Sequence, residues 1–89
     1  MPTTTITLVN KLGLHARAAA KFVNLAKTFS STVSLAKDGS EVDGKSIMNV
    51  MLLAAPVGSE LTLTVEGEDE QPAFESLLEL VNDGFGELD

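Results

Sequence analysis

Residues 3–27 have the sequence TTTITLVNKLGLHARAAAKFVNLAK, in which the spacing of the apolar side chains changes once. Residues 3–9 include apolar side chains that alternate with threonine, which predicts a strand. From Ala16 to about Lys27 the spacing becomes helical, and the apolar stripe consists of Ala19, Phe22, Val23 and Ala26. Residues 10–14 contain a glycine and predict a loop between the two elements.

Three further stretches have the pattern of strands. They are residues 32–36, 41–43 and 60–66, and the last has the cleanest alternation in the chain. Asp38 and Gly39 predict a tight hairpin between the first two.

Two further stretches have the pattern of helices. Residues 47–53 form the shorter one, and Ser46 stands in its N-cap position. The longer one opens at residues 68–72, where acidic side chains suit a helix N-terminus, and it ends at Gly84. Its apolar stripe consists of Phe74, Leu77, Leu78 and Val81.

The predicted order of elements is β-α-β-β-α-β-α. A four-stranded antiparallel sheet with three helices on one face would bury every apolar stripe, so we expect an α+β open-faced sandwich. At this length, residues 1–89 should form a single domain with a modest core. The strand order stays open, because ferredoxin-like folds share much of this order of elements.

The composition argues against several kinds of site. The chain has no cysteine and one histidine, which disfavours disulfides and metal centres. The longest apolar run, residues 50–57, is too short to cross a bilayer and contains a proline. The first residues lack the basic and apolar regions of a signal peptide. We expect a soluble, cytoplasmic monomer without cofactor, metal or membrane insertion.

The net charge of −7 is unevenly distributed. Residues 1–45 carry all six basic side chains and three acids, whereas residues 46–89 carry ten acids and no bases. A chain this acidic, without Trp or Tyr, is a poor candidate for nucleic-acid binding. Because the cations share a half with the histidine, the distribution favours a weakly positive face for an acidic partner. A solvated surface without any recognition role would have the same composition.

His15 stands at the predicted start of the first helix. A helix N-terminus presents N–H groups without intrahelical partners and the positive end of the helix dipole, so it favours anions and a neutral imidazole. A neutral imidazole can attack phosphorus. The phosphoryl group would then lie beside the N–H groups of Ala16 and Arg17 and the Arg17 guanidinium. The alternative is a histidine that caps the helix or is merely exposed.

Two motifs resemble those of one family. Residues 10–19, NKLGLHARAA, resemble the active-site motif of HPr, the histidine-containing phosphocarrier of the bacterial phosphoenolpyruvate-dependent phosphotransferase system. Residues 45–51, KSIMNVM, resemble the second motif of that family, around a regulatory serine. The two motifs lie at the spacing of the family, and the resemblance extends over the whole chain.

The resemblance implies a function. His15 would accept a phosphoryl group on Nδ1 from enzyme I and pass it to a histidine of an enzyme IIA domain, while Arg17 stabilises the phosphoryl group. The chain would be a stoichiometric carrier and not an enzyme, in either a sugar-uptake or a nitrogen-type regulatory branch. Phosphorylation of Ser46 by an HPr kinase would add negative charge to the partner-facing surface and hinder transfer. A serine that only caps its helix is the alternative.

Two positions depart from the family pattern. Ala18 stands where the motif usually has proline, which leaves an additional N–H and more local freedom at the helix start. Asn49 replaces the small or basic residue that is often found in its segment. Because alanine favours helix, we expect the helix and the activity to persist.

We expect partners to dock around His15. The second predicted helix has more apolar side chains than two turns can bury, so we expect Val50 and Leu53 inside and several others exposed. The residues assigned to the docking surface are Leu14, Lys21, Asn24, Lys27, Ile47, Met48, Met51 and Leu52. Burial of about half of the apolar ones is the alternative.

Two other function classes remain open from the sequence. A purely regulatory binding module of the same fold typically lacks the histidine, so His15 argues against it. A small hydrolase of acylphosphatase-like architecture would need an anion-binding loop with an arginine and an asparagine, which Arg17 and Asn10 match only weakly. Release of inorganic phosphate from an acyl phosphate would distinguish the hydrolase from a carrier.

Overall fold

Every predicted strand and helix is present, with small shifts at the ends. The computed structural model describes residues 2–86. The strands are β1 (Thr3–Thr7), β2 (Thr32–Lys37), β3 (Ser40–Asp43) and β4 (Glu60–Glu66). The helices are α1 (Ala16–Ala26), α2 (Ile47–Leu52) and α3 (Glu70–Asn82), and a short 3-10 turn, η1 (Gly84–Gly86), follows α3.

The strands form one antiparallel sheet in the order β1-β4-β2-β3. β4 lies between β1 and β2, and its Leu63 is opposite Leu35 of β2. The hairpin between β2 and β3 turns at Asp38 (φ 52°) and Gly39 (φ 86°), and two positive φ values are those of a type I′ turn. The Asp-Gly pair therefore forms the predicted hairpin, and the structure supplies the strand order that the pattern left open.

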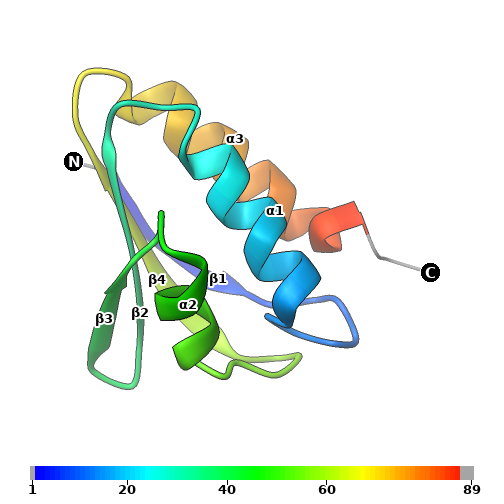
Figure 1. The fold of residues 1–89 in the computed structure, drawn as a ribbon. Coiled ribbons are helices and arrows are strands. Elements are labelled where there is room, and N and C mark those ends of the chain that lie inside the picture. Colours follow the sequence, from blue (N-terminus) through cyan, green and yellow to red (C-terminus); the bar gives the residue numbers. More distant parts are fainter. Residues whose placement is uncertain (1, 87–89) are drawn as a thin grey trace.

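All three helices lie on one face of the sheet, with α1 and α3 side by side and α2 next to α1 (Figure 1). Leu61, Leu63 and Val65 of β4 point into this helical layer and are buried. The predicted stripe of α1 is buried as well, since Ala19, Phe22, Val23 and Ala26 are almost inaccessible to solvent. The α+β open-faced sandwich is thus confirmed. Within residues 2–86, no helix has the length and apolar character needed to cross a membrane.

The buried side of α3 differs in part from the prediction. Leu77 and Val81 are buried as expected, but Phe74 and Leu78 are only partly buried. Ala73, which was not predicted, occupies a fully buried position instead. The stripe is therefore rotated by about one residue, which brings a small side chain against the sheet and leaves the larger ones at the edge.

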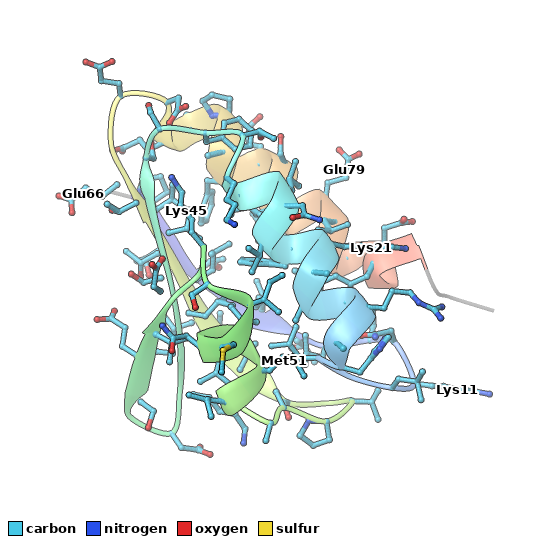
Figure 2. All side chains as sticks on the ribbon, in the orientation of Figure 1. Lys11, Lys21, Lys45, Met51, Glu66 and Glu79 are labelled. Carbon is cyan, nitrogen blue, oxygen red and sulfur yellow. The ribbon has the colours of Figure 1, made fainter. Side chains whose placement is uncertain are left out.

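Phe85 closes the core after α3 and was not predicted. Its side chain is 1% exposed, and its φ of 57° lies in the left-handed region. The Phe85 carbonyl accepts a hydrogen bond from Lys21 Nζ at 2.7 Å, so α1 holds the turn that buries the ring. Figure 2 shows Lys21 reaching from α1 towards this turn.

Asp69, the N-cap of α3, is hydrogen-bonded to Ser30 and Ser31 in the segment that follows α1. Its carboxylate accepts hydrogen bonds from the amides of Ser30 (2.8 Å) and Ser31 (2.9 Å) and from the Ser31 hydroxyl. These hydrogen bonds, with that of the Ser31 hydroxyl as the largest contribution, lower the pKa of Asp69 from 3.8 to about 2. The contact stabilises an end of the helical layer distant in sequence from His15.

Candidate functional site

His15 is the N-cap of α1. Its backbone is extended (φ −78°, ψ 178°), and its carbonyl accepts the first hydrogen bond of the helix from the Ala19 amide at 2.8 Å. The side chain is half-buried and makes no capping hydrogen bond to the helix. The first-turn N–H groups of an α-helix have no intrahelical acceptors. His15 therefore stands at the start of α1, as the sequence predicts, next in the chain to donors of a kind that favours anions.

The loop before His15 is fixed to the segment that follows α2. The Leu14 amide donates to the Ala55 carbonyl at 2.9 Å, and the Gly13 amide donates to the Asn10 carbonyl at 3.1 Å. Gly13 has a φ of 64°, and a Cβ there would come within 2.8 Å of Pro56. Only glycine suits both the backbone conformation and the close approach. These contacts fix the direction in which the chain enters α1.

Leu14 is a correction to the predicted docking surface. Its side chain is only 6% exposed and belongs to the core. The Leu14 amide donates to the Ala55 carbonyl, and the buried side chain offers almost no area to a partner.

Arg17 is exposed in the first turn of α1, two residues after the N-cap. Lys21, Asn24 and Lys27 are also exposed on this helix or at its end. The Lys21 ammonium is already engaged by the Phe85 carbonyl, so it has a structural contact that the sequence did not indicate. Lys11 extends outwards from the loop before α1 (Figure 2). Lys11 and Arg17 thus place positive charge near the start of α1, whereas Lys27 lies at the other end of the helix.

Ala18 replaces the usual proline without loss of the helix. It lies in the first turn of α1 and is fully buried. The predicted helix is therefore confirmed at this position, which agrees with the high helix propensity of alanine.

Ser46 is the N-cap of α2, as predicted. Its hydroxyl oxygen accepts a hydrogen bond from the Asn49 amide at 3.3 Å, and its carbonyl accepts from the Val50 amide at 2.9 Å. The side chain is half-exposed and can therefore be reached from solvent. Ser46 thus caps α2, and this role does not exclude modification of the same hydroxyl.

The exposed side of α2 is strongly apolar. Val50 (0% exposed) and Leu53 (7%) attach the helix to the core, as predicted. The other apolar residues form a surface that we call the α2 patch: Ile47 (37% exposed), Met48 (79%), Met51 (42%) and Leu52 (76%). None of the four is buried, so the predicted exposed apolar surface is present.

Two exposed side chains near this region were not predicted. Leu12 (69% exposed) lies in the loop before His15, and Val57 (50%) lies in the turn after Pro56. The two segments meet where Gly13 contacts Pro56. A leucine in a loop gives no periodic signal, and only its exposure identifies it as available to a partner.

Surface hollows lie elsewhere on the molecule. One is lined by residues of α1 and α3 such as Leu25 and Leu80, with Asp83 at the end of α3, and another by residues of β2, β3 and the following loop. Neither is lined by His15 or Arg17. Among residues 2–86 there is also no group of three side chains suited to hold a metal ion. At the candidate site, Arg17 is exposed and His15 is half-buried.

Comparison with known proteins identifies the family. Residues 2–83 match the family model described as the PTS HPr component phosphorylation site. The chain belongs to the HPr family. The phosphocarrier protein HPr of Cupriavidus necator is 54% identical over 81 residues, which cover 91% of each chain. HPr-C-His of Thermoanaerobacter tengcongensis has 44% identity and a TM-score of 0.96 over the whole of both chains. An HPr dimer from the same organism has 45% identity and a TM-score of 0.79 over 98% of this chain and 100% of that one.

Membership of the HPr family establishes the coarse function. The chain is a phosphocarrier of the phosphotransferase system, as the resemblance of its two motifs implies. HPr proteins carry phosphoryl groups, so the hydrolase reading of Asn10 and Arg17 has no support from the comparisons.

Proposed function

We propose that His15 accepts the phosphoryl group from a phosphohistidine of enzyme I and passes it to a histidine of an enzyme IIA domain. The observation that carries this proposal is the position of His15 at the N-cap of α1, with exposed Arg17 in the first turn. When the neutral imidazole carries its proton on Nε2, Nδ1 has a lone pair. That lone pair attacks phosphorus, a new N–P bond forms, and the N–P bond of the donor breaks. The second transfer repeats these steps with His15 as the donor.

Arg17 and the first-turn amides of α1 stabilise the transferred group. The guanidinium and the backbone N–H groups of Ala16 and Arg17 supply directed hydrogen bonds to phosphoryl oxygens. The phosphoryl group on nitrogen keeps a high transfer potential, whereas a serine ester would be too stable to pass the group onwards. Stabilisation by a few exposed donors is compatible with release, because solvent and the partner compete for the same oxygens. The chain acts as a stoichiometric carrier and not as an enzyme.

The α2 patch and the cations of α1 form the docking surface. Its residues are Lys21, Asn24, Lys27, Ile47, Met48, Met51 and Leu52, and exposed Leu12 extends it. Apolar side chains supply the contact area, and the positive charges favour an acidic partner. Methionine suits a surface that fits several partners because its side chain is flexible. Both enzyme I and enzyme IIA domains would use this surface in turn.

Ser46 is the regulatory position in this proposal. A phosphate on its hydroxyl would add about −1.5 to −2 charge beside the α2 patch. An acidic partner would then be repelled, while the N-terminus of α2 would tolerate the charge locally. An HPr kinase is the proposed source of the phosphate. Sugar uptake and nitrogen-type regulation are both compatible with this arrangement. We propose that the protein is cytoplasmic and monomeric. Sedimentation of the purified protein would test the monomeric state.

Labelling with phosphoenolpyruvate tests the acceptor. Wild type, His15→Ala and Ser46→Ala are incubated with enzyme I, magnesium and labelled phosphoenolpyruvate. We expect acid-labile, alkali-stable label on wild type and Ser46→Ala and none on His15→Ala. Circular dichroism of each variant controls for folding. Label that persists on folded His15→Ala, or its absence from folded wild type with an active enzyme I, would overturn the proposal.

A further inference from the structure

The side chains most open to oxidation in this chain are few, and two of them lie together on α2. The chain has no cysteine, tryptophan or tyrosine and three methionines. Met48 and Met51 are three residues apart in α2, which brings them to the same side of the helix. They are 79% and 42% exposed, so an oxidant in solution can approach both side chains. The third methionine, Met1, lies outside the described residues.

The packing of α2 separates these methionines from the core. Val50 and Leu53 are the buried anchors of the helix, at 0% and 7% exposure. Ser46 supplies the N-cap through its hydroxyl. A change of polarity at Met48 or Met51 therefore alters the surface, and it leaves the contacts that stabilise the fold in place. Met51 projects from α2 in Figure 2.

We propose that Met48 and Met51 form a modification site for peroxide, and that their oxidation to methionine sulfoxide weakens docking to the phosphotransfer partners. The sulfur lone pair attacks one oxygen of hydrogen peroxide, an S–O bond forms and the O–O bond breaks. Sulfur loses two electrons, and the peroxide leaves as water. A thiol-dependent sulfoxide reductase reverses the step, because two thiols become a disulfide and the oxygen leaves as water.

The effect on docking rests on the proposed function. A sulfoxide is polar. A partner that covers the α2 patch must remove water from the sulfoxide oxygen without supplying a hydrogen bond in its place. The KM of the enzyme I-dependent phosphorylation should rise about fivefold or more, since about 1 kcal/mol of lost binding is a factor of about five. The chemistry at His15 is untouched, so kcat should change much less. The melting temperature should also stay nearly constant, because both side chains lie outside the core.

The test compares wild type with the double variant Met48→Leu, Met51→Leu. Each protein is treated with hydrogen peroxide, and each treated sample is compared with its own untreated sample. Peptide mass spectrometry should find one added oxygen at Met48 before Met51, in the order of their exposure. The KM should rise on treatment of wild type and not of the double variant. The variant retains Met1 and His15, so it controls for oxidation at other positions.

Reversal and stability complete the test. A methionine sulfoxide reductase with dithiothreitol should restore the KM of oxidised wild type. Oxidised wild type with an unchanged KM, an equal loss in the double variant, or a large fall in melting temperature would each overturn the inference. Untreated wild type that accepts no label would instead overturn the proposed function, and the mass spectra would still show whether the two thioethers are the oxidised sites.

Discussion

The amide of Leu14 donates a hydrogen bond to the carbonyl of Ala55 at 2.9 Å. This contact joins the residue before His15 to the segment that follows α2. The start of α1, which carries the proposed phosphoryl acceptor, and the end of α2, which carries part of the α2 patch, are therefore held to one another. In the proposed function, a partner that docks on α2 would meet His15 in a fixed position.

Gly13→Ala should disturb this junction more than a glycine substitution elsewhere. An added Cβ would meet the Ala55 carbonyl and Pro56, and the φ of 64° strains any larger residue. We expect the free energy of unfolding to fall by about 2–4 kcal/mol and phosphoryl acceptance by His15 to slow. Urea denaturation and labelling rates measure the two effects.

Gly58→Ala is the matched control for this prediction. Gly58 has a φ of 86°, and no atom lies within 4 Å of an added Cβ. Gly58→Ala should lower the free energy of unfolding by only about 1 kcal/mol, because the backbone strain remains and the steric collision is absent. Equal losses in the two variants would show that the contact with Ala55 and Pro56 is unimportant.

Three substitutions of Ser46 should distinguish its capping of α2 from the effect of negative charge at this position. Ser46→Ala should lose about 1 kcal/mol of stability, because the hydrogen bond to the Asn49 amide is lost. Ser46→Asn and Ser46→Asp both keep a capping side chain, so their stability should stay near that of wild type. Only Ser46→Asp adds negative charge, and its KM for phosphorylation by enzyme I should rise, most strongly at low salt. A similar rise for Ser46→Asn would argue against an electrostatic cause.

Arg17→Gln should slow transfer without loss of stability. The side chain is exposed, so its replacement leaves the core intact. We expect phosphorylation of His15 to slow about tenfold, since a charge-assisted hydrogen bond to a phosphoryl oxygen contributes about 1.5 kcal/mol or more. Rapid-quench kinetics give the rate, and Lys37→Gln on β2 controls for the loss of one positive charge. An equal effect in both variants would show that Arg17 acts only through its positive charge and not through a specific hydrogen bond to the phosphoryl group.

Asp69 should make stability sensitive to acid. Its pKa is lowered to about 2 by hydrogen bonds from Ser31 and Ser30, whereas its ordinary value is 3.8. Because the folded-state pKa is the lower one, the ionised carboxylate stabilises the fold above pH 3.8, and this contribution is lost as the pH falls towards 2. Asp69→Asn should be less stable than wild type at neutral pH. Its free energy of unfolding should also change less between pH 3.8 and about pH 2.

Urea denaturation between pH 5 and pH 2 measures this dependence. Glu79→Gln, which removes an exposed carboxylate from the same helix, is the control. If the slope of stability against pH is the same in wild type and Asp69→Asn, the hydrogen bonds to Ser30 and Ser31 do not control the acid sensitivity.

The sequence predicts the elements of this protein well because each has a local signal. The alternation in β4, the Asp-Gly turn and the capping position of Ser46 involve neighbours in the chain and appear in the structure where expected. The same holds for His15, whose position at a helix start follows from the change of spacing after it.

Features that depend on distant residues could not be predicted. Phe85 is buried by a left-handed backbone and a hydrogen bond from Lys21, and neither leaves a periodic pattern. Leu14 stands in a loop and has no periodic signal of burial, yet its side chain is only 6% exposed. The hydrogen bonds between Asp69 and Ser31 join residues that are 38 positions apart. Such contacts arise from the packing of the helices, which composition and spacing do not determine.

Transfer from the isolated phosphoprotein tests the central claim most directly. The chain is phosphorylated with labelled phosphoenolpyruvate, separated from enzyme I and mixed with a purified enzyme IIA domain. We predict that label leaves His15 and appears in equal amount on a histidine of the enzyme IIA domain, with little inorganic phosphate formed. Label released as inorganic phosphate, or retained on the chain in the presence of a functional acceptor, would contradict the account of His15 as a phosphoryl carrier.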